Sequence, residues 1–295
     1  MSLNSGHGTK FVGLVPDVLM QKIGLSESQP GVRVYRNALY GFAAELTPEQ
    51  LAVLKSDRLV KAIEPDKKIS LAMASDWGKP SFEPKSELPT GVARVEGHLS
   101  KTARTAGGVK VDIAVIDSGI NEKHPDLNVF RTASFLPGAE GDTHIGHDES
   151  GHGTHVAGII AARNDGKGIT GVAPGARLWA VQVLDRYTSG SISDIVAGIN
   201  FVAKNAGEIE VANMSLGGKY SSAVIDTAIS NAVDAGVTFI VAAGNLGEDA
   251  ETFTPASNGK VLTVSAVSDT DGKGGGKGGP WDNGRTACSR SGRIA

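Results

Sequence analysis

Four of the chain's seven histidines lie within one short segment, THIGHDESGHGTH, which spans residues 143–155. Imidazole and carboxylate groups this close together allow two kinds of chemistry. One is a zinc site, for which the candidate ligands are His144, His147, Asp148 and His152. The other is proton transfer by a single histidine that acts as general base. His152 and His155 are three residues apart, whereas helical zinc motifs usually space their histidines by four, so the spacing favours the general base.

His152 is a candidate for that base because of its place in the segment GHGTHVAG. It begins a predicted helix and lies between Gly151 and Gly153, which let other groups approach closely. The start of a helix is expected to lower the pKa of a histidine, and this favours the neutral form that a base needs. A buried histidine with a purely structural role is the alternative. His155 is expected to be a packing residue.

Other functional groups follow predicted strands. Asp117 ends the apolar run VDIAVID, where a carboxylate either caps a helix or belongs to a site. Asn245 follows the run VTFIVAAG and is either a turn residue or an amide donor for an oxyanion. Gly217 and Gly218 follow NMSL and leave a backbone edge to which an extended peptide could add as a strand.

The order of elements predicts an α/β fold with a mostly parallel sheet and helices on both faces. Short apolar runs that read as buried strands cover residues 111–117, 177–184, 210–216, 237–244 and 260–267. Helical patterns lie between them at 152–163, 191–205 and 221–235. The active site of such a sheet is expected at the carboxyl ends of its strands.

A small α+β, ferredoxin-like domain is predicted to precede this sheet. Its helix should cover residues 48–56, because Thr47 to Gln50 form a capping box with Pro48 at the first helical position. Residues 33–46 and 59–64 read as strands. The predicted organisation is an N-terminal domain at 8–72, a linker at 73–92, the parallel-sheet domain at 93–268 and a Gly-rich tail at 269–295.

Composition excludes several classes of protein. The 295 residues carry a net charge of −3, which argues against a nucleic-acid partner. The single cysteine, Cys288, rules out an intramolecular disulfide. No apolar run approaches the ~20 residues of a membrane span, so no membrane partner is expected. The run FVGLVPDVLM is interrupted by Pro16 and Asp17, and no signal peptide is evident.

Together these motifs resemble a known family. The segments VIDSGI, HPDL, GHGTHVAG, GVAPGARLWAVQVL, NMSLGG and VAAGN occur in the order and spacing of the subtilisin-like serine proteases, over about residues 90–268. The segment GFAAELTPEQLAVLKSDRLVKAIEPD resembles the inhibitor-like propeptide that precedes these proteases. The resemblance implies a secreted zymogen that hydrolyses peptide bonds in peptide or protein substrates. It also implies inhibition by the protein's own propeptide, and no cofactor for the chemistry itself.

The resemblance assigns roles to single residues. His152 matches the general base, Asp117 the carboxylate that orients it, and Asn245 the amide of the oxyanion hole. Nine further residues match the family's substrate-binding strands and pocket wall: Ser189, Gly190, Ser191, Ser215, Leu216, Gly217, Gly218, Ala243 and Gly244. The pocket wall is small and apolar, so a broad preference for apolar side chains of the substrate is expected.

RNDGKGIT resembles the family's structural calcium loop, although a plain turn is the alternative. The matching ligands are the carboxylates of Asp126 and Asp165 and the carbonyls of Arg163, Lys167 and Ile169.

One element of the family pattern is missing. These proteases carry their nucleophilic serine in a segment like Gly-Thr-Ser-Met-Ala, several dozen residues after the asparagine. Ser289 and Ser291 lie in a Gly-rich stretch without helical periodicity and do not match it. We therefore expect a C-terminally incomplete, poorly stable and inactive chain with exposed apolar surface along its sheet. The alternatives are a non-catalytic protein that binds peptides or proteases and, more remotely, a zinc-binding protein.

Overall fold

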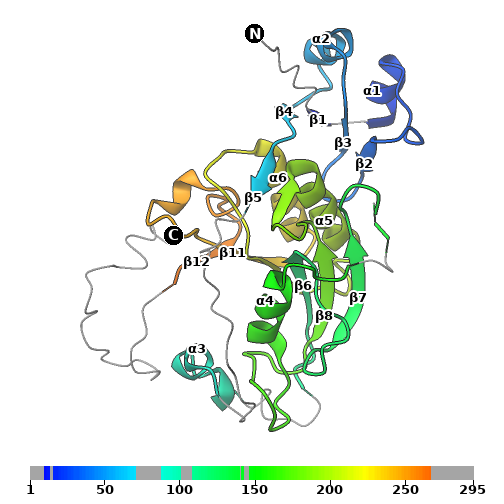
Figure 1. Cartoon of the computed structure of the whole chain (residues 1–295). Coiled ribbons are helices and arrows are strands. Elements are labelled where there is room, and N and C mark those ends of the chain that lie inside the picture. The colour runs from blue at the N-terminus through cyan, green and yellow to red at the C-terminus, as the bar shows by residue number, and fades with distance from the viewer. Residues whose placement is uncertain are drawn as a thin grey trace, which may run out of the picture.

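The structure, a computed structural model, describes residues 10–13, 16–70, 88–100, 108–139, 141–142 and 146–266. They form a four-stranded antiparallel sheet near the N-terminus and a six-stranded parallel sheet after it (Figure 1). The predicted tail, most of the predicted linker and the candidate zinc ligand His144 lie outside the described residues.

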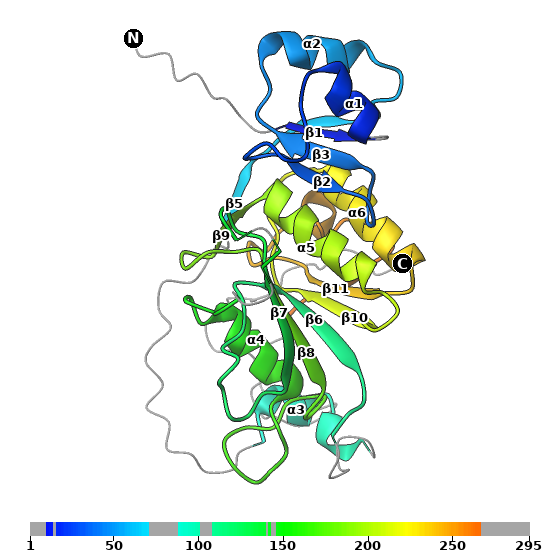
Figure 2. The ribbon, with the colours of Figure 1, turned by 90° about the vertical axis from the view of Figure 1, so that its right-hand side faces the viewer.

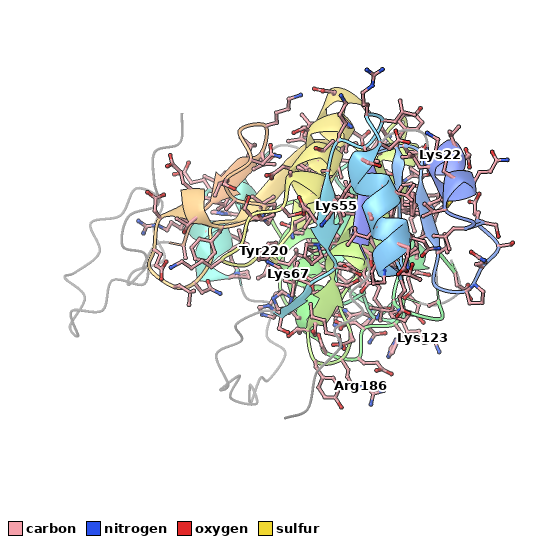
Figure 3. The ribbon with its side chains drawn as sticks, turned by 90° about the horizontal axis from the view of Figure 1, so that it is seen from above. Lys22, Lys55, Lys67, Lys123, Arg186 and Tyr220 are labelled. Carbon is pink, nitrogen blue, oxygen red and sulfur yellow. The ribbon has the colours of Figure 1, made fainter. Side chains whose placement is uncertain are left out.

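The N-terminal domain is the predicted α+β unit, with strand order β2-β3-β1-β4. Leu19 and Met20 of α1 and Leu54 of α2 pack on Phe42, and all four are buried. In the view from above, Lys22 of α1 and Lys55 of α2 mark the two helices (Figure 3). The elements are β1 (Lys10–Gly13), α1 (Pro16–Lys22), β2 (Arg33–Tyr35), β3 (Gly41–Ala44), α2 (Pro48–Ser56) and β4 (Ile63–Pro65).

Local contacts explain where the sequence prediction of this domain holds and where it fails. Helix α2 covers the predicted residues. It begins where predicted because Thr47 and Gln50 form the capping box: each side chain accepts the backbone N–H of the other residue, at 2.9 and 3.2 Å. The predicted strand at 59–64 begins only at Ile63, since the Asp57 carboxylate accepts the Leu59 N–H at 2.9 Å and forms a turn.

The parallel sheet has the order β12-β11-β10-β6-β8-β7, and every neighbouring pair runs in the same direction. Its side chains alternate between two apolar clusters: Ile113 and Val115 of β6 face one, and Ala114 and Ile116 face the other. The predicted α/β fold is therefore confirmed. The strands are β6 (Asp112–Asp117), β7 (Val129–Ser134), β8 (Arg177–Gln182), β10 (Val211–Met214), β11 (Thr238–Ala242) and β12 (Leu262–Val264).

Helices cover both faces of this sheet. The N-terminal domain packs on the layer of helices that covers one face (Figure 2). Helix α4 (His152–Ala161) packs on one face, while α5 (Ile192–Lys204) and α6 (Ala223–Asp234) pack on the other. Tyr35, Ala38 and Leu39 of the N-terminal domain are buried in the same cluster as α5 and α6, so the two domains share one core. None of the helices in the described ranges is long and apolar enough to cross a bilayer.

Short elements connect and join the domains. Strand β5 (Lys68–Ser70) pairs antiparallel with β9 (Ser189–Ser191). Helix α3 (Thr90–Arg94) begins inside the last residues of the predicted linker. Single 3₁₀ turns cover Gly97–Leu99 and Ala250–Thr252.

A large groove lies on the face of the sheet that α4 covers only in part. It has a volume of about 1110 Å³ and is bordered by α3, α4 and the ends of β10, β11 and β12. Val92, Ile159, Ile240, Ala242 and Val264 give it apolar walls. Apolar side chains gathered in such a groove are typical of a place where another segment or molecule packs.

The contact between α5 and the sheet yields a stability prediction. A Cβ at Gly198 would lie 2.6 Å from Val183 Cγ1 and 3.1 Å from Val181 Cγ1, both buried. We expect Gly198→Ala to destabilise the chain by about 1–3 kcal/mol through overpacking, measured as a lower urea midpoint. Gly207→Ala is the control, because a Cβ there meets nothing within 4 Å. Equal midpoints for the two variants would contradict the prediction.

Candidate active site

The structure brings Asp117 and His152 together. Asp117 is the last residue of β6 and is fully buried, and His152 is the first residue of α4. Asp117 Oδ1 lies 2.7 Å from His152 Nδ1. A carboxylate at this distance holds the proton of the neutral ring on Nδ1, so Nε2 keeps a free lone pair that can accept a proton.

Two glycines allow the strand end and the helix start to approach this closely. A Cβ at Gly153 would lie 2.1 Å from the carbonyl oxygen of Gly119. Gly119 itself has a φ of 101°, and a Cβ there would lie 2.4 Å from the carbonyl oxygen of Gly146. Any larger residue at either position would push His152 away from Asp117.

Asp148 fixes the first turn of α4. Its carboxylate accepts the N–H groups of Gly151 and Thr154 at 2.8 Å each, the Thr154 hydroxyl at 2.6 Å and the Ser118 hydroxyl at 2.9 Å. It is 8% exposed and lies at the positive end of the helix, where a carboxylate is stabilising. Because both of its oxygens are engaged here, Asp148 is a helix cap in this structure rather than an available zinc ligand.

The two other described candidates, His147 and His152, are engaged elsewhere. His147 is exposed, and its Nδ1 lies 3.4 Å from Glu122 Oε2. His152 has its Nδ1 directed at Asp117. Across the described ranges, no three histidine, cysteine or acidic side chains are grouped closely enough to hold a metal ion.

The pKa of His152 is raised from its ordinary value, chiefly by the hydrogen bond to Asp117. Burial opposes this rise, and the negative charges of Asp117 and Asp148 add to it. The expectation of a lowered pKa, based on the helix start, is therefore wrong. A charged hydrogen-bond partner at 2.7 Å outweighs the partial charge of the helix end.

The first predicted substrate segment is already paired with a strand of the N-terminal region. Ser189, Gly190 and Ser191 form β9, in which Gly190 lies opposite Ile69 of β5. Ile69 is 4% exposed and belongs to the core shared with α5 and α6. Gly190 has to be small, because a Cβ there would lie 2.1 Å from the carbonyl oxygen of Val183.

The second predicted substrate segment differs from the expectation at Gly218. The N–H and C=O of Gly218 both bond to the backbone of Thr254, at 3.0 Å each, so its edge is not free for a peptide. Leu216 is buried, and a Cβ at Gly217 would lie 2.8 Å from the Thr254 carbonyl oxygen. The prediction missed this pairing because Thr254 lies far along the chain and in no periodic pattern.

The remaining pocket residues line the groove beside α4. Ser215, Ala243, Gly244 and Asn245 all border it, and so does His155, which is exposed rather than packed as expected. Phe253, which sequence reasoning missed, packs its buried ring against Gly244. Among the described residues, the hydrogen bond found at the ring of His152 is the one to Asp117, and no serine hydroxyl is hydrogen-bonded to the ring.

Two residues of the predicted calcium loop, Arg163 and Gly168, contact Asp126. A Cβ at Gly168 would lie 2.7 Å from Asp126 Oδ2, so this carboxylate packs directly against the glycine. The N–H of Arg163 donates to the Asp126 carbonyl at 3.0 Å. Asp165 is exposed, and its Oδ1 accepts the Lys167 N–H at 3.0 Å. The Asp126 carboxylate thus gives this loop a hard oxygen donor of the kind that calcium binds.

The Asp117–His152 contact predicts the titration of the histidine. A raised pKa means that folding favours the imidazolium, so its stabilising contribution is present below about pH 6.5 and is lost as the pH rises through the raised pKa. In Asp117→Asn we expect the pKa of His152 to fall and this pH-dependent contribution to shrink. Histidine nitrogen and carbon NMR shifts, followed over pH, measure it. An unchanged pKa of His152 in the variant would contradict the assigned cause.

Comparison with known proteins agrees with the resemblance seen in the motifs. Residues 108–293 match the model of the subtilase family, and residues 17–72 match that of peptidase inhibitor I9. Subtilisin E of Bacillus subtilis (strain 168) is 39% identical over 250 residues, which are 83% of this chain and 61% of the relative. The thermostable alkaline protease of Halalkalibacterium halodurans is 39% identical over 224 residues, or 76% of this chain and 56% of the relative.

The chain thus spans about three fifths of the length of these curated relatives. The family match itself covers more than half of the chain and includes both Asp117 and His152. Taken with the parallel sheet and the preceding inhibitor-like domain, it shows that the chain belongs to the subtilase family.

Proposed function

We propose that the whole protein is a serine endopeptidase that hydrolyses peptide bonds in peptide or protein substrates. The observation that carries this proposal is the 2.7 Å contact between Asp117 and His152 at the carboxyl edge of the sheet. His152 is the general base, and Asp117 holds its tautomer and stabilises the imidazolium that forms. Asn245, at the end of β11, supplies an amide donor to the oxyanion. This chemistry uses protein groups alone and needs no cofactor.

The nucleophile completes this arrangement from outside the described residues. We propose that a serine-bearing segment packs into the groove of about 1110 Å³, since that groove is apolar and reaches Asn245. In the 295 residues of this chain no segment matches the family's serine motif, so we propose that the chain by itself is inactive. Binding of peptides without cleavage is the alternative, which the strand pairing of β5 with β9 supports.

The N-terminal domain is proposed to act as an intramolecular inhibitor. Its strand β5 occupies the edge of β9, where the backbone of an extended substrate would pair. Its acidic residues also meet the first turns of two helices: Glu64 accepts the Ser222 hydroxyl at 2.8 Å, and Asp66 accepts the Ser193 hydroxyl at 2.7 Å. These contacts support the proposal that the N-terminal domain is bound to the parallel-sheet domain before a substrate can pair with β9. By the family resemblance we further propose that the protein is exported.

The side-chain preference of the substrate site is proposed to be apolar. Ser215, Ala243 and Gly244 give the site small walls, and Leu216 and Phe253 place buried apolar surface behind them.

Calcium is proposed as a structural ligand of the loop beside Asp126. When bound, it would bring oxygen ligands from Asp126 and from the loop at 163–169 to one point and so fix the end of α4. Asp165 and the carbonyls of Arg163, Lys167 and Ile169 are the proposed partners of Asp126.

Labelling with a fluorophosphonate probe, read by intact mass, tests the serine chemistry. The whole protein is expected to give one adduct on a single serine, and His152→Ala is expected to lose it because the serine is no longer activated. The 295-residue chain is expected to give none. An adduct on the chain itself would contradict the missing nucleophile, and an unlabelled whole protein would leave peptide binding as the function.

Calorimetric titration with calcium tests the loop. We expect one bound ion per chain and a higher thermal midpoint in excess calcium than in chelator. Asp126→Ala should weaken binding at least tenfold, because a charged ligand is removed from the site. Asp234→Ala removes a carboxylate that is 61% exposed elsewhere and should leave binding unchanged. Equal affinities in the wild type and Asp126→Ala would exclude this carboxylate as a ligand.

A further inference from the structure

We propose that the buried ion pair between Arg33 and Asp194 is the specificity contact between the N-terminal domain and the parallel-sheet domain. A domain that occupies this face of α5 has to bring a cation against Asp194. The inference rests on the proposed inhibitory role of the N-terminal domain and names the interaction that matches this inhibitor to this partner.

The pair joins the two domains, and both of its side chains are largely buried. Arg33 lies in β2, an edge strand of the N-terminal sheet, and its Nη1 is 2.5 Å from Asp194 Oδ1 in the first turn of α5. The two side chains are 14% and 5% exposed. Water and salt screen such a pair less than a fully exposed one, and either charge left buried without its partner would be unfavourable.

Asp194 connects this ion pair to the strand that the N-terminal region covers. Its second oxygen accepts the Ser191 N–H at 2.7 Å, and the Ser191 hydroxyl accepts the Asp194 N–H at 3.1 Å. Ser191 belongs to β9, where it lies opposite Lys68 of β5. One carboxylate therefore holds the guanidinium of the inhibitor domain and the backbone of the strand that the inhibitor blocks.

A second carboxylate makes the cation necessary. Asp66 lies near the same turn of α5, where it accepts the N–H and hydroxyl of Ser193 at 2.9 and 2.7 Å. A polar cavity of about 490 Å³ separates the domains here, and its charged lining residues are Arg33, Asp66, Lys68, Asp185 and Asp194. Without Arg33, three carboxylates would face Lys68 alone across this cavity.

This arrangement defines the partner that the α5 face accepts. A domain with a neutral residue at this position of its edge strand would leave the buried Asp194 without a cation. A domain with an acidic residue there would add a further negative charge. An acidic residue opposite Asp194 would bring two like charges together at the interface, and such repulsion selects against the wrong partner.

Hydrogen exchange of the full chain, read by mass spectrometry over β5 and β9, tests the proposal. In Arg33→Gln the amides at 68–70 and at Gly190 should exchange faster by about 30-fold or more, the factor that matches the lower bound for breaking a buried charge pair. Arg33→Lys keeps the charge and should stay closer to the wild type. Asp194→Asn keeps an oxygen for the Ser191 N–H but removes the charge, and should also exchange faster.

The double variant Arg33→Gln with Asp194→Asn measures the coupling. Because neither charge is then left alone, its exchange should be accelerated much less than the product of the two single effects. Two independent, multiplying effects would overturn the proposal even if each single variant were impaired.

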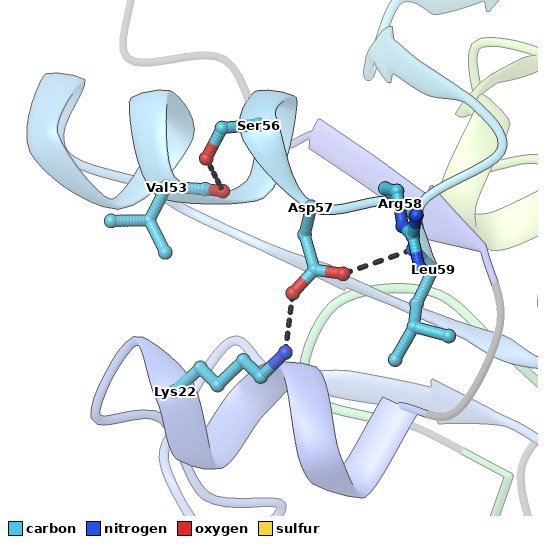
Figure 4. A pocket seen from close by; sticks show the side chains of 6 residues that line it. All are labelled: Lys22, Val53, Ser56, Asp57, Arg58 and Leu59. Carbon is cyan, nitrogen blue, oxygen red and sulfur yellow. Dashed lines mark hydrogen bonds and ion pairs between the residues drawn. The ribbon is translucent and has the colours of Figure 1, made fainter.

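Lys22→Gln is the matched control. Lys22 and Asp57 form an ion pair of the same 2.5 Å length within the N-terminal domain, but the lysine is 45% exposed (Figure 4). It should leave exchange at β5 and β9 unchanged. If Arg33→Gln behaves like Lys22→Gln, the ion pair is not the specificity contact, although docking stands. If the wild type shows no protection at β5 and β9, docking and the proposed inhibition fail together.

Discussion

The candidate active site depends on one steric constraint, the approach of the first turn of α4 to the end of β6. Gly153 and Gly119 meet backbone to backbone there, and neither has room for a Cβ. Because of that approach, Asp117 and His152 share a hydrogen bond of 2.7 Å. The rest of the local structure maintains it: Asp148 caps α4, and the alternating residues of β6 anchor the strand in two apolar clusters.

The second organising feature is the core that the two domains share. Tyr35, Ala38, Leu39 and Ile69 are buried with residues of α5 and α6, so the N-terminal domain contributes to the interior of the whole molecule. Polar contacts then determine its orientation. Asn200 of α5 alone accepts three successive backbone N–H groups of the β2–β3 loop, at 2.8 to 3.2 Å. Separation of the domains would expose apolar surface and strip several buried polar groups of their partners at once.

The sequence could predict what depends on short-range pattern. The buried strands ending at Asp117 and near Asn245, the start of α4 at His152 and the capping box of α2 all follow from neighbours a few residues away. Contacts between distant segments could not be predicted. Strands β5 and β9 have three residues each and no periodicity, and the bonds of Gly218 to Thr254 join separate loops. The predicted direction of the His152 pKa shift was wrong for the same reason, because the main cause of the shift is Asp117, a residue on another element.

The contacts that hold His152 in place come from one short part of the chain. The described contacts that hold His152 come from residues 117–154: Asp117 at the ring, the Ser150 hydroxyl at its backbone N–H, and Asp148 at the helix start. Asp117 Oδ1 accepts hydrogen bonds from the His152 ring and from the Ser118 N–H. Its buried Oδ2 has no hydrogen-bond partner among the described residues. The buried negative charge of Asp117 therefore has few partners, and a positive charge on the imidazole stabilises it. The site is therefore arranged to favour the protonated histidine, which is the state that a base reaches after it has taken up a proton.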